Sequence, residues 1–178
     1  MRSIYAVISF LVTFSLFFVL DNKMGDVPPI GRFLSPFQGF WQNAESREVQ
    51  NRELRLKELK EPVEVYFDEH MIAHLFAKND HDLYFAQGYI TAKDRLWQMD
   101  FQTRFAAGRL SEVVGEKALE LDKYQRRMGM TFGAEKMLEA LEGNPKIKEI
   151  TKAYADGVNA YIISLKPGDY TIEFKILD

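Results

Sequence analysis

The stretch that decides the fold is DLYFAQGYITAKDRLWQMDFQTRFAAGRLSEVVGEKALELD, residues 82–122. In its first part, residues 83–107, apolar side chains recur at steps of three and four, which is the spacing of one helix face. One row is Leu83, Ala86, Ile90, Trp97, Phe101 and Phe105, and a second row is Phe85, Tyr89, Ala92, Leu96 and Met99. A helix that is apolar on most sides is typical of a protein interior, so the pattern predicts a buried helix.

Three adjacent charged residues interrupt this apolar helix: Lys93, Asp94 and Arg95. A charge inside a protein is tolerated when it is paired and hydrogen-bonded. We therefore predict that Asp94 and Arg95 form an internal ion pair that holds the fold. No nucleophile or base is recognisable beside them, so neither residue is assigned a catalytic role.

Glycines divide the segment that follows. Gly108 breaks the long helix, and Ser111 is predicted to cap a second helix that runs to residue 121. Asp122 and Arg126 have the i to i+4 spacing of an ion pair, and Gly129 is expected to end this unit.

Two more helices are expected toward the end of the sequence. Residues 133–142 are amphipathic and are closed by Gly143. Asn144 and Pro145 then start the last long helix, because proline is favoured at the first helical position. Its predicted buried stripe is Ile147, Ile150, Tyr154, Val158, Tyr161 and Leu165. Residues 171–177 alternate like the beginning of another element.

Upstream of the long helix the hydrophobic pattern has period two. Residues 63–68 and 72–76 alternate apolar and polar side chains, which predicts a β-hairpin. Before it, residues 45–61 carry opposite charges at i to i+4 spacing and predict a solvated helix that ends at Pro62. The stretch Asn79-Asp80-His81-Asp82 could suggest a calcium site, but we interpret it as the N-cap of the long helix.

The three histidines raise the question of a metal site. His70 and His74 are four residues apart, a spacing that suits metal binding on a helix but not in a strand, where both lie on one face with Ile72 between them. No third ligand follows at metal spacing except His81. We therefore interpret all three as structural or surface residues and predict no metal ligand in this chain.

The N-terminal segment is an uncharged apolar run, residues 4–20, that follows Arg2. As a helix it would be roughly 25 Å long, a little short of the ~30 Å hydrocarbon core of a bilayer. An uncleaved anchor, a cleaved signal peptide and a buried helix compete as interpretations. We prefer the anchor because no Ala-x-Ala cleavage site follows. Arg2 and the free amine should stay in the cytoplasm, which sends the rest of the chain across the membrane.

The predicted organisation has three parts: an anchor or signal over residues 1–23, a linker and charged helix over 24–61, and a domain over 62–178. Three prolines prevent a continuous helix in the first half of the linker. That half also carries four aromatic residues, Phe33, Phe37, Phe40 and Trp41. We prefer a simple linker that lies on the membrane or the domain, and an aromatic interfacial anchor is the alternative.

Composition excludes several classes of function. The chain has 178 residues, of which 47% are hydrophobic and 28% charged, and these fractions are those of a folded protein. Its net charge of −3 argues against nucleic acid as a partner. The absence of cysteine excludes a disulfide framework, a thiol nucleophile, Cys-based metal sites and a lipidated cysteine anchor.

Several blocks in order resemble the start of the penicillin acylase family of N-terminal nucleophile hydrolases. They are FAQGY (85–89), DRLWQM (94–99), GRLSE (108–112) and YADGVNAY (154–161). Residues 63–77 resemble the family's opening hairpin, so the resemblance extends from residue 62 to about residue 174. It departs at Met71, where the family usually has glycine; because methionine reaches positive φ less easily, we expect the turn to be rebuilt.

The resemblance implies an α+β fold: a mainly helical α-chain segment with an edge β-hairpin, contributing outer helices and edge strands to a four-layer αββα sandwich. It implies a precursor that cuts itself and releases a β chain whose N-terminal serine attacks an amide, with its own α-amine as general base. No Gly-Ser dipeptide occurs here, so the chain is interpreted as an N-terminal part of the α chain with no catalytic residue. Arg109, in the GRLSE block, joins Asp94 and Arg95 as a candidate for a structural ion pair.

The implied full-length enzyme hydrolyses a linear amide, of penicillin or another N-acyl substrate, to a carboxylic acid and an amine. Its partners would be the β chain of the same precursor, a small-molecule amide and, through the N-terminus, a membrane. The expected location is the inner membrane facing the periplasm, or the periplasm itself. No cofactor is expected in this segment, although the family pattern allows a calcium ion in the full-length enzyme. The alternatives are an N-acyl homoserine lactone acylase and a catalytically silent membrane-tethered helical scaffold.

Overall fold

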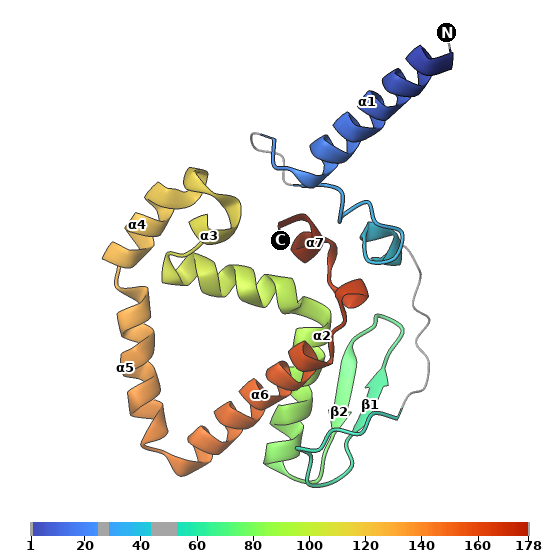
Figure 1. Cartoon of the computed structure of the whole chain (residues 1–178). Helices are drawn as coiled ribbons and strands as arrows, with labels where there is room; N and C mark the ends of the chain where they lie inside the picture. Colours follow the sequence, from blue (N-terminus) through green and yellow to red (C-terminus); the bar gives the residue numbers. More distant parts are fainter. Residues whose placement is uncertain (1, 25–28, 44–52, 178) are drawn as a thin grey trace. The chain divides into compact units, whose positions relative to one another are not determined.

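The computed structural model describes residues 2–24, 29–43 and 53–177, and the chain divides into two compact units. The larger unit is Asn51–Leu165, and the smaller unit combines Met1–Gln50 with Lys166–Asp178. The larger unit carries most of the predicted elements, namely a hairpin followed by helices, as Figure 1 shows. The predicted α+β class with a mainly helical segment is thereby confirmed.

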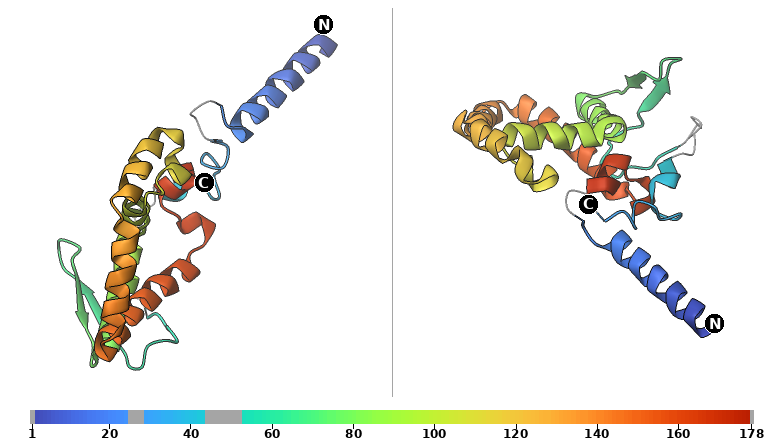
Figure 2. Two further views of the ribbon diagram at one scale, coloured as in Figure 1. Left: turned by 90° about the vertical axis from the view of Figure 1, so that its left-hand side faces the viewer. Right: turned by 90° about the horizontal axis from the view of Figure 1, so that it is seen from above.

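The predicted hairpin is confirmed. Strand β1 (Glu64–Phe67) pairs antiparallel with β2 (Ala73–Phe76), and Tyr66 lies opposite His74. Exposed and half-buried residues alternate along both strands, which matches the period-two pattern of the sequence. Both views of Figure 2 show the hairpin standing off the helices of its unit.

The hairpin turn keeps a left-handed residue where the sequence has no glycine. Met71 has φ 61°, and it alone among the described non-glycine residues has positive φ. Asp68 organises the turn, because its Oδ1 accepts the N–H groups of His70 and Ile72, both at 2.9 Å. The hydrogen bonds from the Ile72 N–H and from the His74 side chain, with a smaller contribution from the His70 N–H, hold the pKa of Asp68 below its ordinary value. Met71 therefore takes the left-handed conformation that is unfavourable for methionine, at a cost in strain, and a turn rebuilt relative to the family stays a prediction.

Helix α2 (Asp80–Ala107) is the predicted long helix, with the predicted cap. The Oδ1 of Asn79 accepts the N–H of Asp82 at 2.9 Å. The helix ends at Gly108, whose φ is 63°. It is kinked in the middle, because Arg95 has the non-helical values φ −140° and ψ 23°.

Helix α6 (Pro145–Ser164), capped by Asn144 as predicted, crosses the first half of α2 (Figure 1). A glycine from each helix makes the crossing very close. A Cβ atom on Gly88 would lie 2.1 Å from the carbonyl oxygen of Tyr154, and one on Gly157 would lie 2.0 Å from that of Phe85. Since real contacts of a Cβ are longer than 3.0 Å, both positions require glycine at this separation.

The core of the larger unit surrounds this crossing. Phe85 and Ala92 of α2 are fully buried, and Ala153 of α6 is 1% exposed. Tyr89 packs edge-on against Tyr161 of α6, with ring centroids 5.5 Å apart. No residue of α2 after Ala92 is buried: Trp97 is half-buried, and Phe101 and Phe105 are exposed. The predicted burial of the whole helix thus holds only for its first half.

The segment between α2 and α6 is divided more finely than predicted. It forms α3 (Ser111–Val114), a 3-10 turn (Glu116–Ala118), α4 (Leu119–Arg127) and α5 (Met130–Glu142). The predicted single helix from Ser111 is broken by Gly115, which has φ 82°. Gly129, at φ 70°, separates α4 from α5 as expected.

Helix α5 has large apolar side chains but little cover. Phe132, Met137 and Leu138 are each more than half exposed, and no residue of α5 is buried. Exposed apolar surface of this extent is typical of a face that contacts another surface.

The predicted charged helix over residues 45–61 is not observed in its described part. Residues 53–61 form turns and irregular backbone, and the rest of that prediction falls mainly on residues 44–52, which lie outside the described residues. The i to i+4 charge pairs expected there stabilise a helix by only a few tenths of a kcal/mol each. That is too little to keep a short helix folded without packing against the rest of the protein.

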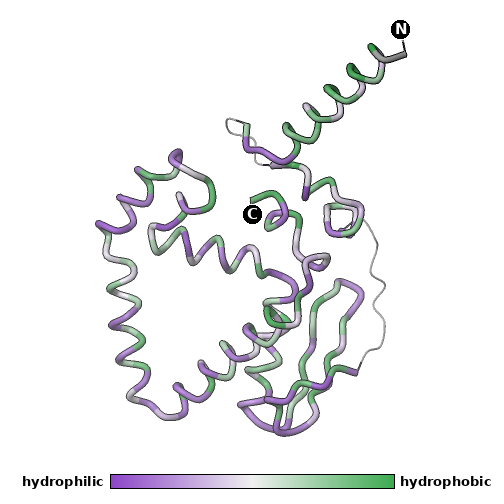
Figure 3. The backbone as a smooth tube through the Cα atoms, viewed as in Figure 1, coloured by the Kyte–Doolittle hydropathy of each residue, from purple (hydrophilic) through white to green (hydrophobic). Residues whose placement is uncertain are grey.

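The smaller unit begins with helix α1 (Arg2–Asp21), which is hydrophobic along most of its length (Figure 3). Its Ile4–Asp21 part is long and apolar enough to cross a membrane, and none of it is buried. Short helical turns follow at Phe40–Asn43 and Pro167–Asp169. The element expected to begin in residues 171–177 is a short helix, α7 (Ile172–Leu177).

We expect Gly157→Ala to destabilise the chain, because the added Cβ must push α2 and α6 apart. Overpacking of this kind costs about 2–3 kcal/mol. Gly133→Ala in α5 is the matched control: nothing lies within 4 Å of its Cβ, and alanine is the better helix former. Denaturant unfolding followed by circular dichroism should show a lower midpoint for the first variant only. Equal midpoints would contradict the close crossing.

Replacing Met71 by glycine should stabilise the hairpin by up to about 1 kcal/mol, since glycine removes the left-handed penalty. Met71→Ala should give no such gain, because alanine keeps the Cβ that causes the strain. Amide hydrogen exchange in β1 and β2 should slow in the glycine variant alone. Slower exchange in both variants would trace the effect to the methionine side chain instead.

Candidate functional site: a carboxylate-centred turn

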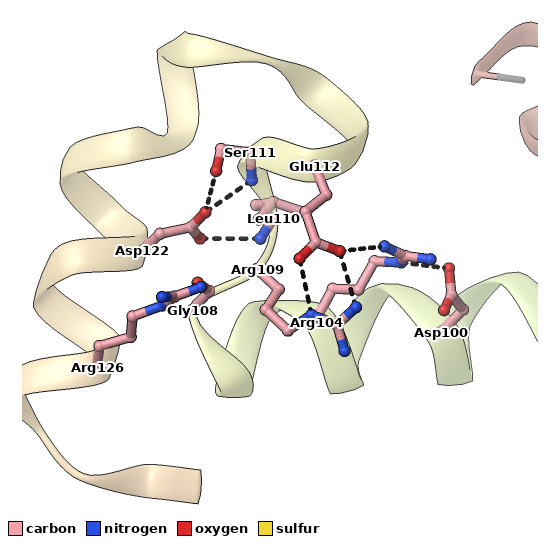
Figure 4. Close-up of polar contacts among 9 residues, drawn as sticks. All are labelled: Asp100, Arg104, Gly108, Arg109, Leu110, Ser111, Glu112, Asp122 and Arg126. Carbon is pink, nitrogen blue, oxygen red and sulfur yellow. Dashed lines mark hydrogen bonds and ion pairs between the residues drawn. The ribbon is translucent and has the colours of Figure 1, made fainter.

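The best-defined polar cluster lies where α2, α3 and α4 meet, and Asp122 of α4 is its centre (Figure 4). Asp122 is 3% exposed. Its Oδ1 accepts the N–H of Leu110 at 2.9 Å. Its Oδ2 accepts the N–H of Ser111 at 2.8 Å and the Ser111 hydroxyl at 2.5 Å. One carboxylate therefore satisfies three donors from the GRLSE block.

Burial of Asp122 acts to raise its pKa, but the hydrogen bonds from Ser111 and Leu110 outweigh this effect. The positive charge of Arg126 acts in the same direction as the hydrogen bonds. The net result is a pKa below the ordinary value of an aspartate. The group is therefore a carboxylate at neutral pH, and its charge is stabilised by the turn that it organises.

Gly108 is held on the other side of the same turn. The Nε of Arg126 donates to the carbonyl oxygen of Gly108 at 2.8 Å. A Cβ at Gly108 would lie 2.6 Å from the carbonyl oxygen of Asp122 and 2.8 Å from Cγ of Arg126. The close approach and the left-handed φ both require glycine here. The predicted Asp122–Arg126 pair is thus replaced by separate contacts of each residue with residues 108–111.

An ion-pair network lies along the outer side of the cluster. Arg109 binds Glu112 with two hydrogen bonds of 2.9 Å, from Nε and from a terminal nitrogen. Arg104 donates to Glu112 and to Asp100, both at 2.9 Å. The hydrogen bond and charge of Arg109 lower the pKa of Glu112, and Glu112 raises the pKa of Arg109. Arg109, a predicted ion-pair candidate, therefore pairs within the GRLSE block, and Glu112 links that block to Arg104 near the end of α2.

Asp94 and Arg95 are placed differently from the prediction. Both are exposed, and no ion pair of either residue is found in the described part of the chain. Arg95 donates to Oε1 of Gln98 at 3.3 Å and occupies the kink of α2. The physical reason is that the buried residues of α2 end at Ala92, so in the part of the chain that the structure describes the two charges remain exposed.

A second buried carboxylate works in the same way as Asp122. Asp82, in the first turn of α2, is 0% exposed and accepts the N–H groups of Lys60 and Glu61 at 3.0 and 2.9 Å. The side chains of Asn79 and His81 add hydrogen bonds of 2.7 and 2.9 Å. Burial raises the pKa of Asp82, but these hydrogen bonds outweigh it and leave the pKa well below its ordinary value. The irregular segment before the hairpin is thereby fastened to α2.

The histidines have no metal-binding arrangement. His74 contacts Asp68 at 3.2 Å, and the ring of His81 stacks on Phe85 beside its contact with Asp82. His70 is largely exposed. Within the described ranges no group of three or more His, Asp or Glu side chains could hold a metal ion. The calcium ion that the resemblance allows in the full-length enzyme stays a prediction.

The cluster fits a structural role and lacks the parts of a catalytic site. The hydroxyl of Ser111 donates to the carboxylate of Asp122, whose lowered pKa makes it a weak base for activating a nucleophile. Sequence reasoning missed the contact of Asp122 with residues 110 and 111 and the roles of Gly88 and Gly157. The available signal for the glycines was their position inside apolar helices, which indicates a packing requirement.

Replacing Asp122 by asparagine should lower the thermal midpoint at neutral pH, because its NH₂ group would face a backbone donor. Glu120→Gln is the control, since Glu120 is on the same helix but is exposed and pairs with Lys123 at the surface. A depressed pKa stabilises the fold above the unfolded value of about 3.9 and loses that contribution as pH falls through the folded value. The difference between wild type and Asp122→Asn should therefore shrink below about pH 4. A difference independent of pH would contradict the role of the charge.

Comparison with known proteins shows which family the segment with the α2–α6 crossing and the Asp122 cluster resembles. Residues 62–178 match the family model described as Penicillin amidase. Penicillin acylase 2 proenzyme from Pseudomonas sp. (strain SE83) is 38% identical over 124 residues, which are 70% of this chain and 16% of that protein. The acyl-homoserine lactone acylase QuiP of Pseudomonas aeruginosa is 42% identical over 82 residues, 46% of this chain and 9% of QuiP.

A solved structure agrees with the sequence matches. The thermostable penicillin G acylase from Alcaligenes faecalis superposes with a TM-score of 0.59 at 30% identity, covering 66% of this chain and 62% of that one. The chain spans a sixth or less of the length of the two curated relatives named above. The predicted resemblance is confirmed, and from the match over residues 62–178 the chain belongs to the penicillin amidase family.

Proposed function

We propose that this chain is an N-terminal part of the α chain of an acylase precursor. The full-length enzyme would hydrolyse a linear amide to a carboxylic acid and an amine. The observation that carries the proposal is the family match over residues 62–178, the segment that holds the glycine crossing and the Asp122 turn. The match covers only 16% and 9% of the length of the two curated relatives named above, which supports placing the reacting residues outside this chain.

In this proposal the chemistry belongs to the N-terminal serine of a β chain from the same precursor. Its hydroxyl oxygen attacks the amide carbonyl carbon while its own α-amine takes the proton, and the amine product leaves. Water then hydrolyses the acyl–serine ester, which releases the carboxylic acid and restores the hydroxyl. Backbone and side-chain donors stabilise the oxyanion. The chain described here supplies outer helices and edge strands of a four-layer αββα sandwich, and none of its residues contacts the reacting atoms.

Two substrate classes are supported by separate relatives. The match to a penicillin acylase covers the larger part of this chain, whereas the match to an acyl-homoserine lactone acylase has the higher identity over a shorter part. We therefore propose a penicillin-like or other N-acyl amide as substrate, with an N-acyl homoserine lactone as the second candidate. The remaining alternative is that the full-length protein has no catalytic activity and serves as a membrane-tethered scaffold.

We further propose that α1 places the enzyme on the outer face of the inner membrane. Its Ile4–Asp21 part would span about 27 Å at 1.5 Å per residue, close to the ~30 Å hydrocarbon core. Arg2 at the start of the helix favours a cytoplasmic N-terminus. The competing arrangement is a cleaved signal and a periplasmic enzyme.

The full-length gene should yield two chains, the second starting with serine, together with amide hydrolysis. Mass spectrometry identifies the new N-terminus, and release of the free amine from penicillin G and from an N-acyl homoserine lactone identifies the substrate class. Changing the junction serine to alanine should leave one uncut, inactive chain.

Asp122→Asn in the same gene should reduce the processed fraction, whereas Glu120→Gln should not. A wild-type precursor that is stable, uncut and inactive with both substrates would refute the proposed acylase activity. The catalytically silent scaffold would then be the remaining proposal.

A further inference from the structure

The segment after α1 is a self-packed turn rather than an extended linker. We call residues 30–43 the aromatic turn. Backbone hydrogen bonds of 2.8–2.9 Å close it, from Leu34 to Ile30, from Gly39 to Ser35 and from Phe40 to Phe33. The ring of Phe40 stacks on that of Phe33 at 5.0 Å and contacts that of Trp41 at 4.1 Å.

The exposed side chains of the aromatic turn are unusually apolar. Phe37 is 82% exposed, Trp41 54% and Leu34 42%. Arg32 is the one charged residue in the sequence of the turn. A patch of this kind, with two aromatic rings and almost no charge, matches the environment at the boundary between lipid tails and water.

Hydrogen bonds from α7 and from the turn before it hold the aromatic turn in place. Lys175 of α7 donates from Nζ to the carbonyl oxygens of Gly39 and Gly168, both at 3.1 Å, and to Oδ1 of Asn43 at 2.6 Å. The side-chain amide of Asn43 donates to the carbonyl oxygen of Tyr170 at 3.0 Å. The aromatic turn therefore has a fixed conformation, which reduces the entropy lost when its exposed side chains bind a surface.

The turn is fastened to the end of α1. The N–H of Gly31 donates to the carbonyl oxygen of Leu20 at 2.8 Å, and a Cβ on Gly31 would lie 3.0 Å from the same oxygen. If α1 spans a bilayer, its Ile4–Asp21 part ends at one interface. A turn held against Leu20 must then lie at the depth of that interface.

We propose that the aromatic turn is a membrane-interface binding site, with Leu34, Phe37 and Trp41 inserted at the level of the lipid headgroups. The partner is the lipid–water boundary in general, because the turn has no basic cluster that would select anionic lipids. This inference rests on the proposed membrane anchoring by α1. Together the two elements would hold the start of the enzyme at the membrane by two contacts.

The two tryptophans of the chain provide the test, because Trp41 lies in the turn and Trp97 lies in α2 of the larger unit. The intact chain would be reconstituted into zwitterionic vesicles that carry bromine, a fluorescence quencher, near the headgroup end of the acyl chains. Trp97→Phe leaves Trp41 as the reporter, and Trp41→Phe leaves Trp97. Trp41 emission should be blue-shifted and quenched, more strongly than with bromine in the middle of the acyl chains, and Trp97 should be unaffected.

Variants separate insertion from general burial. Phe37→Ser, in the Trp97→Phe background, should shift Trp41 emission to the red and weaken its quenching. Phe132→Ser is the control, because Phe132 is an equally apolar residue that is 66% exposed in the larger unit. Added anionic lipid should change nothing.

Two results would overturn the inference. One would also refute the anchoring by α1, and the other would leave that anchoring intact. If alkaline extraction removes the chain from the vesicles, the anchoring by α1 fails and the inference fails with it. If the chain remains integral but Trp41 is not quenched, or is blue-shifted without quenching because protein covers it, the anchor stands and the interface site is refuted.

Discussion

The close crossing of α2 and α6 is the constraint on which the larger unit depends. Gly88 and Gly157 each face a backbone carbonyl of the opposite helix, so at these two positions the backbones of the helices touch directly. This short separation brings the rings of Tyr89 and Tyr161 together and buries Phe85. Because a packed interior has little free volume, any side chain at the crossing would disturb all of these contacts together.

Two buried carboxylates complete the unit where regular secondary structure ends. Asp82 and Asp122 each lie in the first turn of a helix, and each accepts two consecutive backbone N–H groups from a segment earlier in the chain: an irregular one for Asp82 and the start of α3 for Asp122. The helix N-terminus favours a negative charge at this position, and the donors compensate for burial. The unit thus holds its loops with charge-assisted hydrogen bonds, which are directional, rather than with a large apolar core.

The sequence predicted the features that depend on local periodicity and capping. The hairpin, the Asn79 cap of α2 and the Asn144 start of α6 all follow from short-range patterns that the structure confirms. The predictions failed where contacts with residues far away in the sequence determine whether a side chain is buried or paired. Asp94 and Arg95 lie in an apolar stretch, but burial requires a neighbour, and α6 covers only the first half of α2. Asp122 binds residues 110 and 111 instead of Arg126, because unpaired backbone donors demand a partner more strongly than an exposed arginine does.

The exposed apolar side chains of α5 have a consequence for the synthesis of the proposed precursor. A chain that displays Phe132, Met137 and Leu138 to solvent invites self-association and recognition by chaperones and proteases. Synthesis of both halves of an acylase in one polypeptide would supply a covering partner at high effective concentration, before any encounter with other molecules. Equal amounts of the two halves would follow from translation alone, and a cell would need no separate control to match them.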